Sequence, residues 1–311
     1  MPDASARVHQ WRGAAAVTLS SRELEATFLP ELNMLGVSLR LGGEEFLALP
    51  GGVAAYRGQH TTGLPFLAPW ANRLSMREYR SRRTRVDLRG LDLHVDGSGL
   101  PIHGTMSARD AWDVVELSAR GSRAKLRGAY EYRSDAQLAG FPFPHRLETR
   151  VEVDGRSLAI TTRLTPASRR AVPVSFGFHP YFRLPRGRRA HWQLRLPGRV
   201  HLELDERGIP TGSRRRAPAE RRPIGARTFD DLFELERGRT LSLEGAGRRL
   251  GVHFGAGYTH TQVYAPPGTA YVCLEPMTAP TNALVSGSCP VVAPGETFVA
   301  HFLVVPEMLS G

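Results

Sequence analysis

Hydrophobic and polar residues alternate with the period of a β-strand over much of this chain. In residues 147–153, apolar or threonine side chains at every second position alternate with charged ones, and the alternation resumes in residues 158–162. Asp154-Gly155 between them is a strong turn signal, so this stretch predicts a β-hairpin. Shorter runs of the same kind predict further strands at residues 86–88, 91–95, 125–130, 172–177, 240–243, 250–254, 271–274 and 298–305.

Helical patterns are short throughout the sequence. No amphipathic repeat continues beyond two or three turns, and 32 glycines and 23 prolines interrupt nearly every long segment. Many short strands separated by turn signals are typical of a β-sandwich or barrel. Residues 214–227 are the best candidate for a loop, but candidate functional residues occur on both sides of it. We therefore predict an all-β fold with a single domain over residues 1–311.

The composition is normal for a soluble globular protein, with 41% hydrophobic and 23% charged residues. No run of about 18 apolar residues occurs, so we expect neither a membrane span nor a membrane partner. The N-terminal residues lack an apolar signal core, which favours a cytoplasmic location. Cys273 and Cys289 are the two cysteines, too few for a disulfide framework, and neither lies in a zinc-ligand spacing. We therefore expect no metal site.

The formal net charge of +11 comes almost entirely from arginine, because Lys125 is the single lysine. A nucleic-acid-binding protein usually concentrates its positive charge on one element and interleaves aromatic residues. Here the arginine clusters are scattered through sequence that resembles loops, at residues 80–83, 186–189, 214–216 and 221–222. We interpret them as solvated loops and expect no nucleic-acid partner, with anion binding as the alternative.

Three segments carry groups suited to acid–base chemistry. His179 lies within Phe178-His179-Pro180-Tyr181-Phe182, directly after a predicted strand. His103 lies in Ile102-His103-Gly104, and Glu275 follows a run that is expected to be buried. A buried carboxylate without a partner is costly, which favours a functional role for Glu275. Two histidines and a glutamate can exchange protons in pairs near neutral pH.

Two further segments offer groups that could bind a substrate. Asn72 and Arg73 supply hydrogen-bond donors, and Asp230 and Asp231 follow Phe229. Donors, acceptors and aromatic rings together suit a sugar, whose hydroxyls need hydrogen bonds and whose C–H faces need apolar contact. Each residue also has a structural interpretation: a turn at His103, a cap and a surface ion pair at Asn72-Arg73, and a helix-like turn after the two aspartates.

Taken together, these segments resemble the aldose 1-epimerase (galactose mutarotase) family, in the same order along most of the chain. Residues 177–184, Gly-Phe-His-Pro-Tyr-Phe-Arg-Leu, match the longest family signature, although Arg183 stands where asparagine is common. Residues 273–276 resemble the segment that carries the general base. His103 resembles the first family histidine, and Asp230 fits the substrate-binding aspartate better than Asp231 does.

The resemblance implies a large antiparallel β-sandwich, a galactose mutarotase-like supersandwich, that requires no cofactor. It also implies a sugar substrate whose α and β anomers interconvert by ring opening and reclosure. We assign Glu275 as the base and His179 as the acid, and we expect them on opposite sides of the sugar ring. His103, also assigned to the catalytic set, and Arg73 would hydrogen-bond near the ring oxygen, with Asn72 beside them. Asp230 would accept from hydroxyls.

Two other functions stay open at this point. One is a hexose-phosphate 1-epimerase on the same fold, supported by the excess of arginine. The other is a non-catalytic sugar-binding protein, against which the presence of both His179 and Glu275 argues. The expected partner is a small-molecule sugar, and the expected assembly is a monomer or a homodimer.

Overall fold

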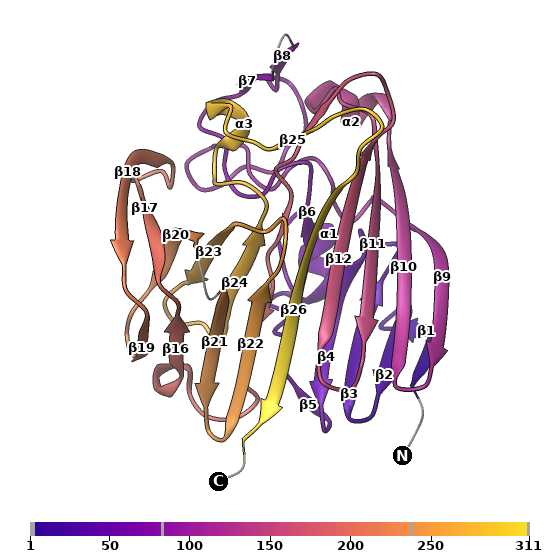
Figure 1. The fold of residues 1–311 in the computed structure, drawn as a ribbon, viewed down its shortest axis with the longest axis vertical. Helices are drawn as coiled ribbons and strands as arrows, with labels where there is room; N and C mark the ends of the chain where they lie inside the picture. The colour runs from indigo at the N-terminus through magenta and orange to yellow at the C-terminus, as the bar shows by residue number, and fades with distance from the viewer. Residues whose placement is uncertain (1–3, 82–83, 237–238, 310–311) are drawn as a thin grey trace.

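The computed structural model describes residues 4–81, 84–236 and 239–309, which excludes Arg82 and Arg83 of the first arginine cluster. These residues form antiparallel β-sheets with little helix, as Figure 1 shows. The helices are short: α1 (Gly52–Arg57), α2 (Asp135–Gly140), α3 (Ala283–Ser286) and the 3-10 turn Arg189–His191. Within the described part of the chain, no helix has the length and apolarity needed to cross a membrane. The predicted all-β class is confirmed.

A nine-stranded sheet forms one layer of the sandwich. The predicted hairpin is confirmed within it as two strands in antiparallel register, with Leu147 opposite Leu164. Four other predicted strands, at residues 125–130, 240–243, 250–254 and 298–305, also lie in this sheet. Its strands in spatial order are β19 (Glu220–Pro223), β16 (Gln193–Leu196), β21 (Thr240–Gly245), β22 (Arg248–Phe254), β26 (Phe298–Met308), β12 (Leu158–Pro166), β11 (His145–Val153), β10 (Arg123–Tyr132) and β9 (Asp113–Arg120).

Two smaller sheets lie behind the nine-stranded sheet in the view of Figure 1. A five-stranded sheet contains β1 (Ser5–Trp11), β2 (Ala14–Ser21), β3 (Leu24–Leu29), β4 (Leu35–Leu41) and β5 (Glu44–Glu45). An eight-stranded sheet has the order β18 (Pro210–Ala217), β17 (Arg199–Leu204), β20 (Phe229–Leu235), β23 (His260–Ala265), β24 (Val272–Met277), β14 (Gly177–Phe178) and β6 (Phe66–Leu67), with β15 (Tyr181–Phe182) also paired to β24. Two small ladders pair β7 (Glu78–Ser81) with β8 (Thr84–Asp87), and β13 (Val172–Pro173) with β25 (Val291–Val292).

The core lies between these layers and follows the alternation seen in the sequence. Along β11, buried positions alternate with half-buried or exposed ones, as expected for a strand with one face on the core. Aromatic rings join the layers: Phe178 of β14 contacts Phe302 of β26 with ring centroids 5.2 Å apart. β24 differs, because all six of its residues are buried. Its outer face is therefore covered, and that face carries the site described below.

Two sequence-based predictions are wrong. Residues 91–95 form a loop rather than a strand; Leu91 and Leu93 pack on the core, which reproduces strand-like alternation without a ladder. Residues 214–227 are not a loop, because they contain the second half of β18 and all of β19. Both are edge strands, where exposed charge is tolerated. Arginines of these two strands form ion pairs with nearby glutamates, at Arg214–Glu234, Arg216–Glu236 and Arg221–Glu244. The interpretation of these two arginine clusters as loops is therefore wrong.

Candidate active site

Neighbouring strands of the eight-stranded sheet place three polar side chains on one face. Glu275 of β24 lies opposite Gln262 of β23 in the register, and Asp230 of β20 is one strand further along. Glu275 is 1% exposed and Gln262 is also buried, whereas Asp230 lies at the open end. Strand periodicity therefore aligns a buried carboxylate, a buried amide and an accessible carboxylate.

His179 lies in the short connection between β14 and β15, directly beside Glu275. Its Nε2 atom is 3.3 Å from Oε1 of Glu275. The imidazole stacks on the ring of Tyr181, with centroids 4.7 Å apart, and meets the ring of Tyr264 edge-on. Because these contacts fix the imidazole plane, His179 and Glu275 form a preoriented pair.

His103 and Asn72 lie in two loops that hold each other in strained conformations. Both have positive φ, 65° for His103 and 59° for Asn72. The His103 backbone N–H donates to the Asn72 carbonyl, and the Asn72 backbone N–H donates to Nδ1 of His103 at 3.3 Å. An Nδ1 that accepts must be unprotonated, so the His103 proton lies on Nε2. The strained backbone of both residues therefore supports a hydrogen bond that fixes one tautomer of the His103 imidazole.

Gly104, which follows His103, lets this loop approach the chain at Ala68. Gly104 has φ +80°, and a Cβ there would overlap the carbonyl group of Ala68. We expect Gly104→Ala to destabilise the fold by about 1–2 kcal/mol from backbone strain plus about 1–3 kcal/mol from overpacking. Gly99→Ala is the matched control, since φ is +75° there but no atom lies within 4 Å of the added Cβ. Equal losses of unfolding free energy in denaturant titrations of the two variants would contradict this account.

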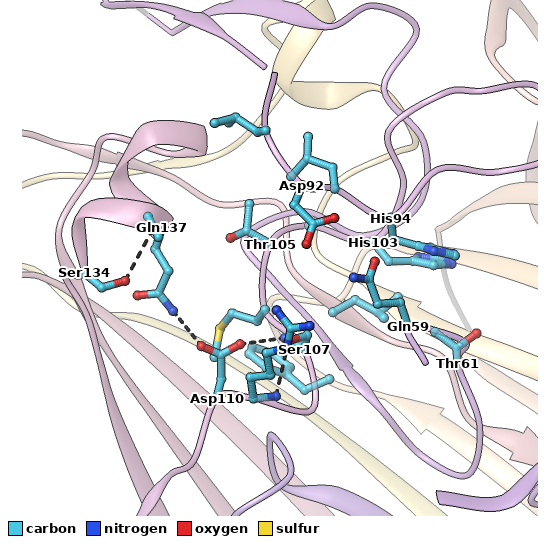
Figure 2. A pocket seen from close by; sticks show the side chains of 18 of the residues that line it. Gln59, Thr61, Asp92, His94, His103, Thr105, Ser107, Asp110, Ser134 and Gln137 are labelled. Carbon is cyan, nitrogen blue, oxygen red and sulfur yellow. Dashed lines mark hydrogen bonds between the residues drawn. The ribbon is translucent and has the colours of Figure 1, made fainter. Parts of the chain in front are cut away.

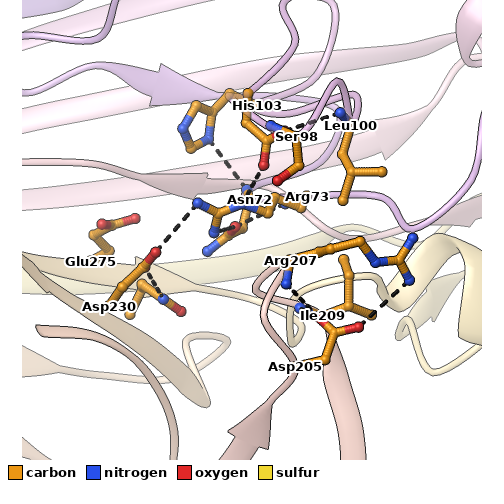
Figure 3. A network of polar contacts seen from close by, with 12 residues as sticks. Asn72, Arg73, Ser98, Leu100, His103, Asp205, Arg207, Ile209, Asp230 and Glu275 are labelled. Carbon is orange, nitrogen blue, oxygen red and sulfur yellow. Dashed lines mark hydrogen bonds and ion pairs between the residues drawn. The ribbon is translucent and has the colours of Figure 1, made fainter.

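Arg73 is the centre of the polar network in Figure 3. Its Nε donates to Asp96 at 2.6 Å, and its two terminal nitrogens donate to Asn72 at 3.2 Å and to Asp230 at 3.3 Å. Asp230 also accepts from the side-chain amide of Gln262 at 2.6 Å. The guanidinium is therefore held between two carboxylates, and Asp230 is fixed from both sides.

Burial controls the protonation of the central groups. It raises the pKa of Glu275 well above its usual value, Asp230 raises it further, and Arg73 opposes both. Burial lowers the pKa of His179 to about 3, with Arg73 acting in the same direction. Burial and the neighbouring His179 also hold the pKa of His103 well below its usual range. Burial therefore favours the neutral form of both members of the His179–Glu275 pair.

The structure brings all six sequence-predicted site residues into this one region, His103, His179, Glu275, Asn72, Arg73 and Asp230, with the imidazole centroids of His103 and His179 5.4 Å apart. The expected placement of acid and base is wrong, however. A contact of 3.3 Å leaves no room for a sugar ring between His179 and Glu275. The two groups lie side by side.

The structure adds three neighbours, Gln262, Tyr264 and Asp96, that the sequence analysis did not identify. Gln262 and Tyr264 alternate with apolar residues on β23, a pattern that fits any half-buried strand. Asp96 lies in a Gly/Ser-rich turn whose composition indicates only a loop. A polar residue within a strand that is expected to be buried is the one signal in the sequence that could have identified such a neighbour, and Gln262 is a residue of this kind.

A further property of the site was hidden by distance in the sequence. A ring nitrogen of His179, Sγ of Cys273 and a carboxylate oxygen of Glu275 lie within 4.8 Å of one another. Nitrogen, sulfur and oxygen ligands of this kind could hold a zinc-like ion. Cys273 and Glu275 lie on β24 and His179 lies in the β14–β15 connection, so the three residues form no compact sequence motif. That no metal is needed stays a prediction.

Comparisons with known proteins agree with this architecture. A family model described as aldose 1-epimerase matches residues 37–304. No curated protein matches the sequence significantly. A solved galactose mutarotase-like protein from Clostridium acetobutylicum is 19% identical over 99% of both chains, with a TM-score of 0.84. Galactose 1-epimerase from Lactobacillus acidophilus is 16% identical, with a TM-score of 0.81 over 99% of this chain and 100% of its own. At such identities these structures show the fold, and they confirm the predicted galactose mutarotase-like β-sandwich.

Proposed function

The chain belongs to the aldose 1-epimerase family, and we propose that it interconverts the α and β anomers of a free hexose. Family and fold together support a carbohydrate epimerase. The observation that carries the finer proposal is the buried contact of 3.3 Å between Nε2 of His179 and Oε1 of Glu275. Pure sugar binding does not require an acid–base pair of this kind.

The side-by-side arrangement suits the reaction better than the opposed one. Carbon 1 of a cyclic aldose bears both the anomeric hydroxyl and the ring oxygen. Glu275 removes the proton of the hydroxyl while His179 donates a proton to the ring oxygen, so the bond from C1 to the ring oxygen breaks and the aldehyde forms. After rotation about C1–C2, the roles reverse and the ring closes on the other face of C1. Two oxygens on one carbon require two adjacent catalytic groups.

The single proton of the pair is enough for this chemistry. In the empty site the proton resides on Glu275, because burial favours the neutral forms of both groups. Transfer across the contact gives a carboxylate beside an imidazolium, which is the reactive form. Arg73 lowers the pKa of Glu275 and therefore favours the carboxylate, while it also lowers the pKa of His179 and opposes the imidazolium. Each well-placed proton transfer contributes roughly 10²–10⁴-fold to the rate.

Other side chains are suited to hold the sugar. His103 presents its Nε2–H as a donor, since Nδ1 is occupied by the Asn72 backbone. Asp230 and Arg73 offer an acceptor and donors at the open end. Within the described residues, Oε2 of Glu275 and Oε1 of Gln262 are buried without a hydrogen-bond partner. Buried acceptors of this kind are ready for hydroxyl donors of a ligand.

The alternative of a sugar phosphate has less support. A phosphate site needs several cationic or backbone donors aimed at one point. Arg73 is already engaged by Asp96 and Asp230. Arg183, the other candidate, lines surface hollows with Tyr271 and Leu184 and not the cavity beside His103. The free hexose is therefore the substrate we propose.

Polarimetry on freshly dissolved α-D-glucose and α-D-galactose tests the function directly. We expect the protein to shorten the approach to anomeric equilibrium, with the same rate in the presence of a chelator. A rate no faster than the spontaneous reaction would support a sugar-binding protein instead. A preference of tenfold or more for glucose 6-phosphate, about 1.4 kcal/mol in transition-state binding, would favour the phosphate epimerase.

A further inference from the structure

A cavity of about 420 Å³ adjoins the candidate active site at His103. It lies between residues 56–61, the loop 90–94, the segment 103–110 and the N-terminal part of α2, as Figure 2 shows. Its volume lies within the range of roughly 300–1,000 Å³ that is typical of small-molecule sites. None of the steps proposed above uses this space.

The cavity and the site share walls. His103 lines the cavity, and its ring contacts that of His179. Thr61 also lines the cavity, and its hydroxyl forms a hydrogen bond of 2.6 Å with the hydroxyl of Tyr181. Tyr181 in turn stacks on His179. A ligand in the cavity would therefore lie next to a sugar held by His103 and His179.

The lining combines a buried apolar floor with polar walls. Tyr56, Phe66 and Met106 are buried at the cavity. On the walls, neither the Gln59 amide nor the Asp92 carboxylate has a side-chain hydrogen bond or ion pair among the described residues, and Figure 2 labels both. Apolar surface beside free amide and carboxylate groups suits the C–H faces and hydroxyls of a sugar.

Buried polar atoms deeper in the cavity point to the same class of ligand. Gln137 is 7% exposed, its amide nitrogen donates to Asp110 at 2.8 Å, and its Oε1 has no partner among the described residues. That oxygen can accept from a hydroxyl. The charges of the lining disfavour an anion, because it contains two carboxylates, those of Asp92 and Asp110, and one guanidinium, that of Arg109. A neutral polyol therefore fits better than a phosphate.

We propose that this cavity is a subsite for a second sugar unit, so that the preferred substrate is a reducing disaccharide or longer oligosaccharide. Its reducing unit lies against His179 and Glu275, and the next unit extends past His103 into the cavity. The inference rests on the proposed function and extends its substrate from a free hexose to a sugar chain whose reducing end is a hexose. Asp92 and Gln59 contact the second unit and determine specificity, but they take no part in the proton transfers.

The experiment compares kcat/KM on glucose with kcat/KM on maltose, cellobiose, lactose and isomaltose, whose linkages direct the second unit differently. We expect at least one disaccharide to exceed glucose by tenfold or more. If glucose is anomerised and every disaccharide is equal or poorer, the subsite is wrong and the proposed function stands. If no sugar is anomerised, the proposed function fails and the subsite fails with it.

Substitutions in the cavity test which residues cause the preference for a disaccharide over glucose. Asp92→Ala and Gln59→Ala are expected to bring the preferred disaccharide to within about threefold of glucose, with the glucose rate unchanged. Asp113→Ala is the matched control, because Asp113 is an exposed carboxylate on β9 outside the cavity. It is expected to keep the full preference. Equal losses on glucose and disaccharide in the Asp92 and Gln59 variants, or an unchanged preference in both, would overturn the assignment.

Discussion

Glu275→Gln is expected to lower kcat/KM for anomer interconversion by at least about 10²-fold while the fold survives. Glutamine keeps the size of the side chain and a hydrogen-bonding carbonyl oxygen, but it can neither accept nor release the proton that ring opening requires. Burial already holds Glu275 in its neutral form, so the change removes no buried charge from the empty protein. Polarimetry or NMR exchange measurements give the rate after the spontaneous reaction is subtracted.

Glu45→Gln is the control for the loss of a partly buried glutamate. Glu45 accepts hydrogen bonds from Ser38 and from the backbone of Leu39 and Leu47, away from the site. Its replacement should lower stability and leave the rate unchanged. A near-normal rate in Glu275→Gln would remove Glu275 from the mechanism.

His179→Asn is expected to reduce kcat/KM by a similar factor, at least about 10²-fold. Asparagine keeps a polar group near Glu275 but cannot deliver a proton to the ring oxygen. His145→Asn is the matched control, because His145 is also buried and its ring stacks on an aromatic ring, that of Tyr132 at 4.6 Å. A loss of rate in the His145 variant would indicate that a buried imidazole affects the rate through packing. A retained rate in the His179 variant would remove His179 from the mechanism.

The pH profile should lack the midpoint of an ordinary histidine. The pair binds a second proton only when the pH falls through the lowered pKa of His179, about 3. It loses its proton only when the pH rises through the raised pKa of Glu275. Between these limits the pair keeps one proton, so kcat/KM should not fall as the pH is lowered from 7 to about 5, as expected for a coupled pair. A fall in kcat/KM on acidification with a midpoint near 6.5, the usual histidine value, would contradict this assignment.

The sequence predicted the strands best where alternation coincides with burial on one face, as in β11 and β12. It failed where the same pattern has another cause. Residues 91–95 alternate because Leu91 and Leu93 pack on the core beside a cavity, and a single sequence does not distinguish that from a ladder. The arginines at 214–216 are polar enough for a loop, yet they line an edge strand with acidic partners across the sheet.

For the site, residue types in short segments identified the candidate groups but not their arrangement. The sequence could not place His179 beside Glu275, because the contact depends on how β14 and β15 pair with β24. The cavity beside His103 could not be predicted either, because residues from segments far apart in the sequence enclose it. Contacts between distant segments are set by sheet topology, and composition and periodicity do not encode that topology.

The double variant His179→Asn/Glu275→Gln tests the central claim, that these two residues act as one proton-transfer pair. Groups that act as a unit lose their effect together, so their replacements are not additive in free energy. We expect kcat/KM of the double variant to lie within about threefold of the slower single variant. A double variant slower by the product of both single losses would show that His179 and Glu275 act independently.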